Sequence, residues 1–269
     1  MQFNRGLRST EFMPGTGLRQ YCRGRLENSA PQPRETKLTT SPIRCFATAE
    51  EASANAASTV ADAIRKAVSQ RGECVLALTG GNTPVDTYRL LAAMDVPWGG
   101  VQVVQTDDRV RPHTETGSNW RMICRTLLDP ASVPEDRRHP MPVDAADPEA
   151  AAAEYAKLLR ALAPDGGADV VLLQLGPDGH LASLFHDRYD PQETSGTQIT
   201  TTVDGAVRMT QTLRSLSAAK TRVLLATGGS KTEAVEKVRS GTADTFATRT
   251  FLGPDGLLLL DEAAAGRVR

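Results

Sequence analysis

A histidine follows a strand-and-turn pattern in the second half of the chain. Residues 170–175 form a short apolar run, VVLLQL, which is typical of a strand buried on both faces. Gly-Pro-Asp-Gly at 176–179 then favours a turn, and His180 comes directly after it. Because buried parallel strands end at the crevice where open α/β sheets bind ligands, we expect His180 to lie there beside Asp178. An imidazole in that position suits a general base, and a loop histidine with a single hydrogen bond is the alternative.

A glycine-rich turn follows another apolar run. Residues 74–78 read as a central strand and end in Thr-Gly-Gly-Asn-Thr-Pro, after which a helix is predicted over residues 85–94. The glycines would let backbone N–H groups turn toward an anion at the helix start. Gly-Gly turns also occur for purely steric reasons, so a simple turn is the alternative. The residues of this candidate phosphate cradle are Gly80, Gly81, Asn82 and Thr83.

A charged cluster follows the strand predicted at residues 101–105. Asp107, Asp108 and Arg109 come shortly after it, and Ser118 and Asn119 open a helix predicted to run to residue 128. Such a cluster can be a surface ion pair worth less than about 1 kcal/mol. Its place at a strand end, like that of the glycine turn and the histidine, favours a role in one shared site.

Taken together, these motifs resemble those of the 6-phosphogluconolactonase family over roughly residues 45–260. GPDGHLASLF at 176–185 is similar to the family signature GPDGHTASLF, and TGGNTP at 79–84 is similar to SGGSTP. The Asp-Asp-Arg cluster and the Ser-Asn that follows resemble the family's DER and SN. Arg208 and Thr210 match an R-x-T segment, and Lys231 matches a lysine near a helix start.

The chain departs from the family pattern at three places. Asp108 stands where glutamate is usual, which shortens that carboxylate by one methylene. Leu181 stands where threonine is usual. Residues 245–249, TFATR, replace a Pro-Ala-Ser element that the family tends to carry before its last strand.

The resemblance implies an enzyme that hydrolyses 6-phospho-D-glucono-1,5-lactone to 6-phosphogluconate in the oxidative pentose phosphate pathway. It implies His180 as the general base on water. Asp178 would orient the imidazole or bind a sugar hydroxyl, and Arg109 would stabilise the oxyanion or hold the phosphate. The residues expected to bind the substrate are Gly80, Gly81, Asn82, Thr83, Asp107, Asn119, Arg208 and Lys231. Lactone opening requires no metal, and we expect no metal and no cofactor.

Three other functions remain open. A glucosamine-6-phosphate deaminase also pairs a GGSTP-like loop with a glycine–histidine loop, but it typically reads GHIAFNEP and DEY where this chain has GHLASLF and DDR. A non-catalytic sugar-phosphate-binding module would need no base and usually accompanies a helix-turn-helix, for which residues 1–43 show no paired amphipathic helices. An inactive relative is disfavoured because His180, Asp178 and Arg109 are all present.

The composition excludes several classes of protein. The chain has 269 residues, of which 40% are hydrophobic, and its net charge of −1 gives no basic excess for nucleic acid. No apolar run is long enough to span a membrane, and the four cysteines lack CxxC spacing, so a disulfide framework and a zinc site are both disfavoured. We therefore expect a cytoplasmic protein that binds neither nucleic acid nor a membrane. The resemblance implies a small sugar phosphate as its partner, and a monomer is the default for its oligomeric state.

Residues 1–43 differ from the rest because they are mildly basic and lack apolar periodicity. We predict a disordered extension there, followed by one domain over residues 44–269. An added cloning segment or an upstream start codon is favoured over an organelle transit peptide, which an Arg-rich, acid-poor segment also resembles.

Strand, glycine turn and helix alternate along the domain. Further helices are predicted over 49–70, capped by Thr48, over 148–162, and from 183, and residues 187–202 read as a surface loop. Pro84 suits the first position of its helix, with Thr83 or Asn82 as the cap. Further strands are predicted over 207–212, 222–227 and 257–260. The alternation predicts an α/β, Rossmann-like fold, in which a doubly wound, mostly parallel sheet carries helices on both faces.

Overall fold

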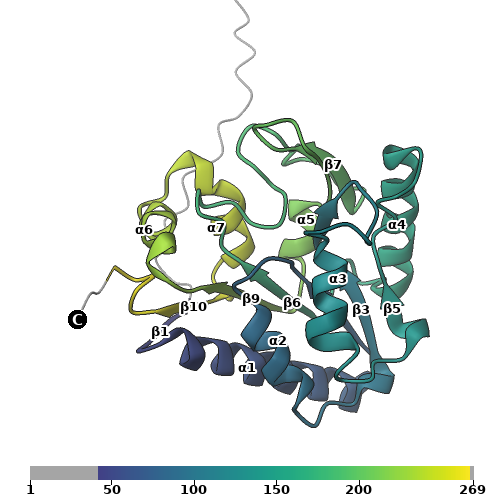
Figure 1. The fold of residues 1–269 in the computed structure, drawn as a ribbon, viewed down its shortest axis with the longest axis horizontal. Coiled ribbons are helices and arrows are strands. Elements are labelled where there is room, and N and C mark those ends of the chain that lie inside the picture. Colours follow the sequence, from purple (N-terminus) through teal and green to yellow (C-terminus); the bar gives the residue numbers. More distant parts are fainter. Residues whose placement is uncertain (1–41, 267–269) are drawn as a thin grey trace, which may run out of the picture. The chain divides into compact units, whose positions relative to one another are not determined.

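The computed structural model describes residues 42–266, so the extension predicted for residues 1–43 lies almost entirely outside the described residues. A seven-stranded sheet runs through this part of the chain, and every neighbouring pair of its strands is parallel (Figure 1). Across the sheet the strands are β1 (Ile43–Phe46), β10 (Leu257–Asp261), β9 (Thr221–Ala226), β6 (Val170–Gln174), β2 (Cys74–Leu78), β3 (Val101–Gln105) and β5 (Arg138–His139).

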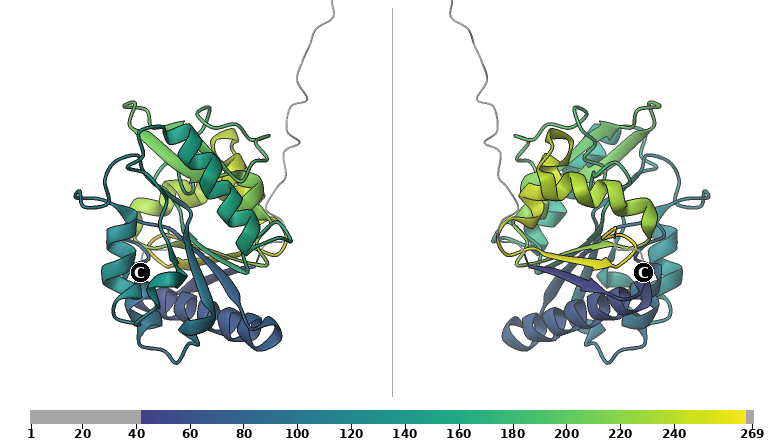
Figure 2. Two further views of the ribbon diagram at one scale, coloured as in Figure 1. Left: turned by 90° about the vertical axis from the view of Figure 1, so that its right-hand side faces the viewer. Right: turned by 90° about the vertical axis from the view of Figure 1, so that its left-hand side faces the viewer.

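Helices cover both faces of this sheet because successive side chains of a strand point to opposite faces. In β2, Ala77 packs into one apolar cluster, whereas Leu76 and Leu78 pack into the other. The helices on the Leu76 face are α1 (Ala49–Arg71), α2 (Val85–Ala92) and α3 (Asn119–Ile123). The helices on the Ala77 face are α4 (Pro148–Leu162), α5 (Leu213–Ser217), α6 (Thr232–Ser240) and α7 (Phe246–Leu252). Figure 2 shows α1 on one side of the sheet and α4, α6 and α7 on the other. The doubly wound, mostly parallel fold predicted from the sequence is therefore confirmed.

A second sheet, which the sequence did not predict, has three antiparallel strands. Its order is β4 (Asp107–Arg109), β8 (Val207–Gln211) and β7 (Thr197–Thr201). The prediction of a loop over residues 187–202 is thus wrong for β7. This strand, TQITT, has a single aliphatic residue, and it is ordered by its ladder to β8 and by the bond from the Thr197 hydroxyl to the Ala152 carbonyl on α4. The sheet matters for the site because β4 and β8 carry Arg109 and Arg208.

Short helical turns complete the described part of the chain. They are η1 (Trp98–Gly100), the π-helical turn η2 (Cys124–Leu128), η3 (Glu135–Arg137), η4 (Gly229–Lys231) and η5 (Ala243–Thr245). The turn η2 continues α3, so the helix predicted over residues 119–128 is one α-helical turn followed by one π-helical turn. Within residues 42–266 we find no helix that is both long and apolar enough to cross a membrane.

Local side-chain caps account for where several helices begin. Thr48 accepts the Glu51 N–H and so caps α1 as predicted, and Asp147 caps α4 by accepting the N–H groups of Glu149 and Ala150. The cap predicted for α2 is wrong. Pro84 itself occupies the N-cap position, and among the described residues no side chain bonds to that helix start.

The helix predicted to start at Ser183 is also absent from the described residues. Ala182 takes a left-handed backbone conformation with φ 48°, and an isolated bridge joins Leu181 to Leu184. The segment therefore forms a tight turn. Ser183 is fixed in this turn because its N–H bonds to Thr210 and its hydroxyl bonds to Asp107. The turn brings the residues after His180 against the second sheet.

Candidate active site

A pocket of about 270 Å³ lies at the carboxyl end of the parallel sheet. Gly80 follows β2, Asp107 follows β3, His180 follows β6 and Lys231 follows β9, so four strands deliver residues to one place. The predicted site residues that line the pocket are Gly80, Gly81, Asp107, Arg109, Asn119, His180, Arg208 and Lys231. Asn82, Thr83 and Asp178 are not among the described residues that line it.

The His180 loop holds the imidazole against Asp178. The Gly176 N–H donates to the His180 carbonyl at 2.7 Å, and the His180 N–H donates to the Asp178 carboxylate at 3.2 Å. The same carboxylate oxygen bonds to His180 Nδ1. A Cβ at Gly176 would lie 2.3 Å from Nδ1, so the imidazole has room only because residue 176 is glycine. The ring of Phe185 packs on the imidazole with 4.4 Å between centroids.

This contact defines the electrostatics of the pair. Burial would raise the pKa of Asp178, but the hydrogen bonds and charge of His180 lower it to about 2, so the carboxylate stays ionised near neutral pH. An ionised carboxylate only accepts, so Nδ1 carries a proton toward Asp178. The other nitrogen, Nε2, is then the one with a free lone pair.

Arg109 and Arg208 stand opposite each other in the ladder between β4 and β8. Arg109 Nη1 donates to Asn119 Oδ1 at 2.6 Å and also to the Gly117 carbonyl, so its guanidinium is held in place. The buried Nε of Arg208 has no hydrogen-bond partner among the described residues. Burial and the charge of Arg109 lower the pKa of Arg208. Burial likewise lowers the pKa of Lys231, against the charge of Asp178. The pocket thus gathers three cationic side chains and suits an anion.

The glycine loop after β2 is packed tightly against two polar side chains. The Gln174 amide donates to the Gly80 carbonyl at 2.9 Å, and a Cβ at Gly81, where φ is +90°, would lie 1.8 Å from that amide nitrogen. A Cβ at Gly80 would lie 1.9 Å from Asn119. The chain then turns away into α2, which is why Gly80 and Gly81 reach the pocket and Asn82 is exposed.

A buried carboxyl group forms another wall of the pocket. Asp107 is 6% exposed and accepts the Ser183 hydroxyl at 2.7 Å and the Thr106 hydroxyl at 3.1 Å. Burial raises its pKa, and the hydrogen bond from Ser183 opposes that shift. Its carbonyl accepts the Asn119 amide at 2.9 Å. Asp107 therefore joins the His180 turn to β4.

Several polar pocket residues were not predicted from the sequence. They are Thr79, Gln174, Ser183 and Thr202. Gln174 is the single polar residue inside the apolar run of β6, and that interruption is a signal that could have identified it. Thr202 follows β7, which the sequence did not predict, so no local signal pointed to it.

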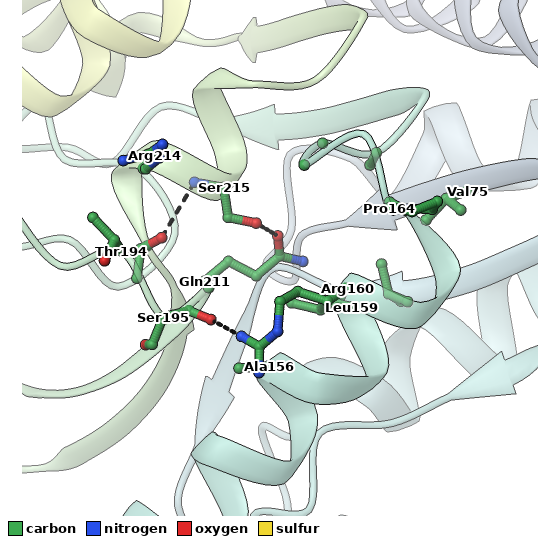
Figure 3. A pocket seen from close by; sticks show the side chains of 17 residues that line it. Val75, Ala156, Leu159, Arg160, Pro164, Thr194, Ser195, Gln211, Arg214 and Ser215 are labelled. Carbon is green, nitrogen blue, oxygen red and sulfur yellow. Dashed lines mark hydrogen bonds between the residues drawn. The ribbon is translucent and has the colours of Figure 1, made fainter.

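A larger cavity, of about 410 Å³, lies between α4, α5 and the loop of residues 163–168. Figure 3 shows Arg160 donating to the Ser195 carbonyl, at 2.6 Å, and Ser215 donating to Gln211, at 3.0 Å. Its described lining has no histidine, no carboxylate and none of the predicted site residues. We therefore assign the chemistry to the smaller pocket. Within residues 42–266 no group of three or more His, Cys, Asp or Glu residues could hold a metal ion.

The fold and the pocket describe an α/β protein in which a histidine paired with a carboxylate lies beside three cationic side chains. The sequence model of the family described as glucosamine-6-phosphate isomerases/6-phosphogluconolactonase matches residues 47–251. A 6-phosphogluconolactonase of Synechocystis sp. is 37% identical over 217 residues, which cover 77% of this chain and 89% of that protein.

Solved structures agree with this match. The structure of 6-phosphogluconolactonase from Trypanosoma brucei is similar with a TM-score of 0.74 and 27% identity, and the similarity covers 86% of this chain and 100% of that one. A monomeric glucosamine-6-phosphate deaminase has a TM-score of 0.75 at 24% identity, over 84% of this chain and 100% of that one, and shares the fold. The chain belongs to the glucosamine-6-phosphate isomerase/6-phosphogluconolactonase family, as its motifs predicted.

Proposed function

We propose that the chain is a 6-phosphogluconolactonase that hydrolyses 6-phospho-D-glucono-1,5-lactone to 6-phosphogluconate in the oxidative pentose phosphate pathway. The observation that carries this proposal is the pairing of His180 with an ionised Asp178 at the end of β6, in a pocket lined by cationic side chains. Relatives of that name, such as the Synechocystis protein, support it.

The reaction needs one base and one stabilised oxyanion. His180 Nε2 takes a proton from a water molecule, and the water oxygen bonds to the lactone carbonyl carbon. The resulting tetrahedral intermediate collapses, the bond from that carbon to the ring oxygen breaks, and the imidazolium returns its proton to the leaving oxygen. The product is an open-chain hydroxy acid, which ionises to 6-phosphogluconate. Asp178 keeps the proton on Nδ1 and stabilises the imidazolium between the two transfers.

The cationic residues divide between two tasks. Arg109 is fixed by Asn119 and the Gly117 carbonyl, and a donor that is already in place suits the oxyanion that develops in the transition state. Arg208 has an unpartnered buried Nε among the described residues and suits the substrate phosphate. Lys231 and the backbone of the glycine loop complete this phosphate site.

The deaminase alternative is not favoured. In GHIAFNEP the fifth residue after the histidine is glutamate, whereas here it is Phe185, whose ring packs on His180. A phenyl ring cannot carry the protons that an aldose–ketose conversion moves. Hydrolysis of an activated ester needs no second proton carrier at this position.

The first test replaces His180 by alanine. The lactone is generated in situ by glucose-6-phosphate dehydrogenase, and 6-phosphogluconate dehydrogenase reports its opening, with spontaneous hydrolysis subtracted at slightly acidic pH. We expect His180→Ala to lose about 10²–10⁴-fold in kcat and still to bind 6-phosphogluconate. His186→Ala, at a histidine outside the described pocket lining, is the matched control and should retain activity. Near wild-type turnover in His180→Ala would overturn the base assignment.

We propose that the protein is a monomer located in the cytoplasm. Its partner is a small sugar phosphate, and it binds neither nucleic acid nor a membrane. The net charge of −1 supports the absence of a nucleic-acid partner. Size-exclusion chromatography with light scattering tests the oligomeric state, and a dimer mass at micromolar concentration would contradict the proposal.

A further inference from the structure

We propose that Asp108 and His113, which the mechanism above does not use, form an ion pair that positions Arg109 and Asn119 in the pocket. The proposal rests on the proposed function, because Arg109 and Asn119 matter only if the pocket turns over its substrate. Asp108 and His113 are positioning residues, since neither is among the described residues that line the pocket.

Asp108 is a buried carboxylate on which many donors converge. It is 1% exposed. Oδ1 accepts the backbone N–H groups of Arg109 at 2.8 Å and Asn119 at 3.0 Å. Oδ2 accepts the Trp120 N–H at 3.0 Å and the Gln105 amide at 2.9 Å. One side chain therefore holds both β4 and the start of α3, the two segments that carry Arg109 and Asn119.

His113 supplies the cation for this carboxylate. Its Nδ1 lies 3.5 Å from Asp108 Oδ2 and 3.1 Å from the Ser118 hydroxyl oxygen, and its Nε2 lies 2.9 Å from the Met141 carbonyl oxygen. A carbonyl only accepts, so Nε2 carries a proton. The Ser118 hydroxyl oxygen also lies 3.3 Å from Asp108 Oδ2, and when it donates its proton to that carboxylate it accepts one from Nδ1. This arrangement of acceptors around both ring nitrogens suits the imidazolium that we propose.

The charged groups around His113 agree with that state. Burial would lower its pKa, but the hydrogen bonds to Asp108 and the Met141 carbonyl, together with the charges of Asp108 and Asp144, raise the pKa above its ordinary value. Burial would raise the pKa of Asp108, and bonds from His113, Asn119 and other donors lower it instead. Both groups are therefore stabilised in their ionised forms.

The ion pair closes a ring of hydrogen bonds through Gln105 and Met141. The Gln105 amide donates to Asp108, the Met141 N–H donates to Gln105 Oε1 at 2.7 Å, and His113 donates to the Met141 carbonyl. Met141 is fully buried, so the ring is anchored in the core. The segment between His113 and Asn119 is held at both of its ends.

The pocket geometry depends on that segment. Arg109 Nη1 bonds to the Asn119 side chain and the Gly117 carbonyl, and the Asn119 amide in turn bonds to the Asp107 carbonyl. When the His113 cation is removed, Ser118 at the start of α3 loses a hydrogen-bond partner, and the guanidinium of Arg109 is no longer held in one position.

The test compares His113→Gln with His139→Gln. His139 is a half-buried histidine that bonds to Gln102 at 2.7 Å and lies outside the described pocket lining, so it is a matched control. For His113→Gln we expect kcat to fall about tenfold, with KM and the Kd for 6-phosphogluconate within about threefold of wild type, because misplacing a donor affects the transition state most. His139→Gln should keep the wild-type kcat.

A folded His113→Gln variant with wild-type kcat would overturn the proposal, and so would an equal loss of kcat in His139→Gln. If His113→Gln does not fold, ¹⁵N NMR of the wild-type imidazoles decides the question. A His113 that titrates at or below the ordinary value of about 6.5 would contradict the ion pair. A wild type without lactonase activity would count against the proposed function instead, and the NMR titration would still report on the ion pair.

Discussion

Replacing Asp178 by asparagine removes the charge beside His180 while keeping the shape of the side chain. The carboxylate has a pKa lowered from 3.8 to about 2, for which His180 is the main cause opposing burial. A pKa difference of one corresponds to about 1.4 kcal/mol, so a fully buried pair would be worth roughly 2 kcal/mol. Because the Asp178 side chain is 60% exposed, solvent screening reduces this to about 1 kcal/mol, or roughly fivefold in rate.

A change of the His180 tautomer lowers kcat further. The asparagine amide can donate to Nδ1, which favours the imidazole tautomer with its proton on Nε2 and no lone pair for water. We therefore expect kcat of Asp178→Asn to fall by about 10- to 100-fold, a smaller loss than that of His180→Ala. KM should change little, because the effect falls on the transition state.

The pH dependence follows from the sign of the Asp178 shift. A lowered pKa means that the pair contributes above about pH 4 and is lost as pH falls through about 2. Asp178 therefore stays ionised over the whole assay range, and its own titration should not alter the difference in kcat between wild type and Asp178→Asn. Asp187→Asn is the matched control, since Asp187 also contacts a histidine, His186, at 3.3 Å. A kcat within twofold of wild type in Asp178→Asn, or an equal loss in Asp187→Asn, would refute the reasoning.

Two further substitutions test the supports of the pocket. Gly81→Ala introduces a Cβ 1.8 Å from the Gln174 amide and should raise KM at least about tenfold. The control is Gly72→Ala, where φ is +81° and the space is open; it should lower the free energy of unfolding by about 1 kcal/mol and leave KM unchanged. Equal KM values for the two variants would contradict the expectation for Gly81. Tyr155→Phe removes the hydroxyl oxygen that accepts the buried Gln105 N–H at 2.9 Å. It should lower the free energy of unfolding, measured by urea denaturation, by about 1–3 kcal/mol. A urea midpoint equal to that of wild type would contradict this expectation.

The central strands of the parallel sheet were predictable because they are largely apolar runs, whereas β1 (Ile43–Phe46) and β5 (Arg138–His139) are short, contain charged residues and were not predicted as strands. Cys74–Leu78, Val170–Gln174 and Thr221–Ala226 are buried along most of their length, and parallel strands covered on both faces have this composition. Thr197–Thr201 was not predictable from its own residues. Its threonines acquire their burial from β8 and α4, which are contacts between segments distant in sequence.

The site was predictable where a motif carries it and not where tertiary packing does. His180, Asp178 and the glycine loop belong to turns whose residue types are demanding. Asn82 and Thr83 belong to the same motif, yet the described pocket is lined by Gly80 and Gly81, because the left-handed turn at Gly81 redirects the chain. Local sequence also gave no reason to connect Asp108 with His113, whose contact depends on the path of the loop between them.

The order of strands in the parallel sheet has a consequence for synthesis of the chain. β10 lies between β1 and β9, so the first strand has no partner in the described sheet until the last strand is made. During synthesis on the ribosome, β1 stays unpaired while more than two hundred residues are added, whereas α1 can already pack on β2 and α2. The central strands β2, β3 and β6 can pair earlier. A nascent chain that stops before Leu257 therefore exposes the edges of β1 and β9, and we expect such incomplete chains to aggregate more readily than the finished chain.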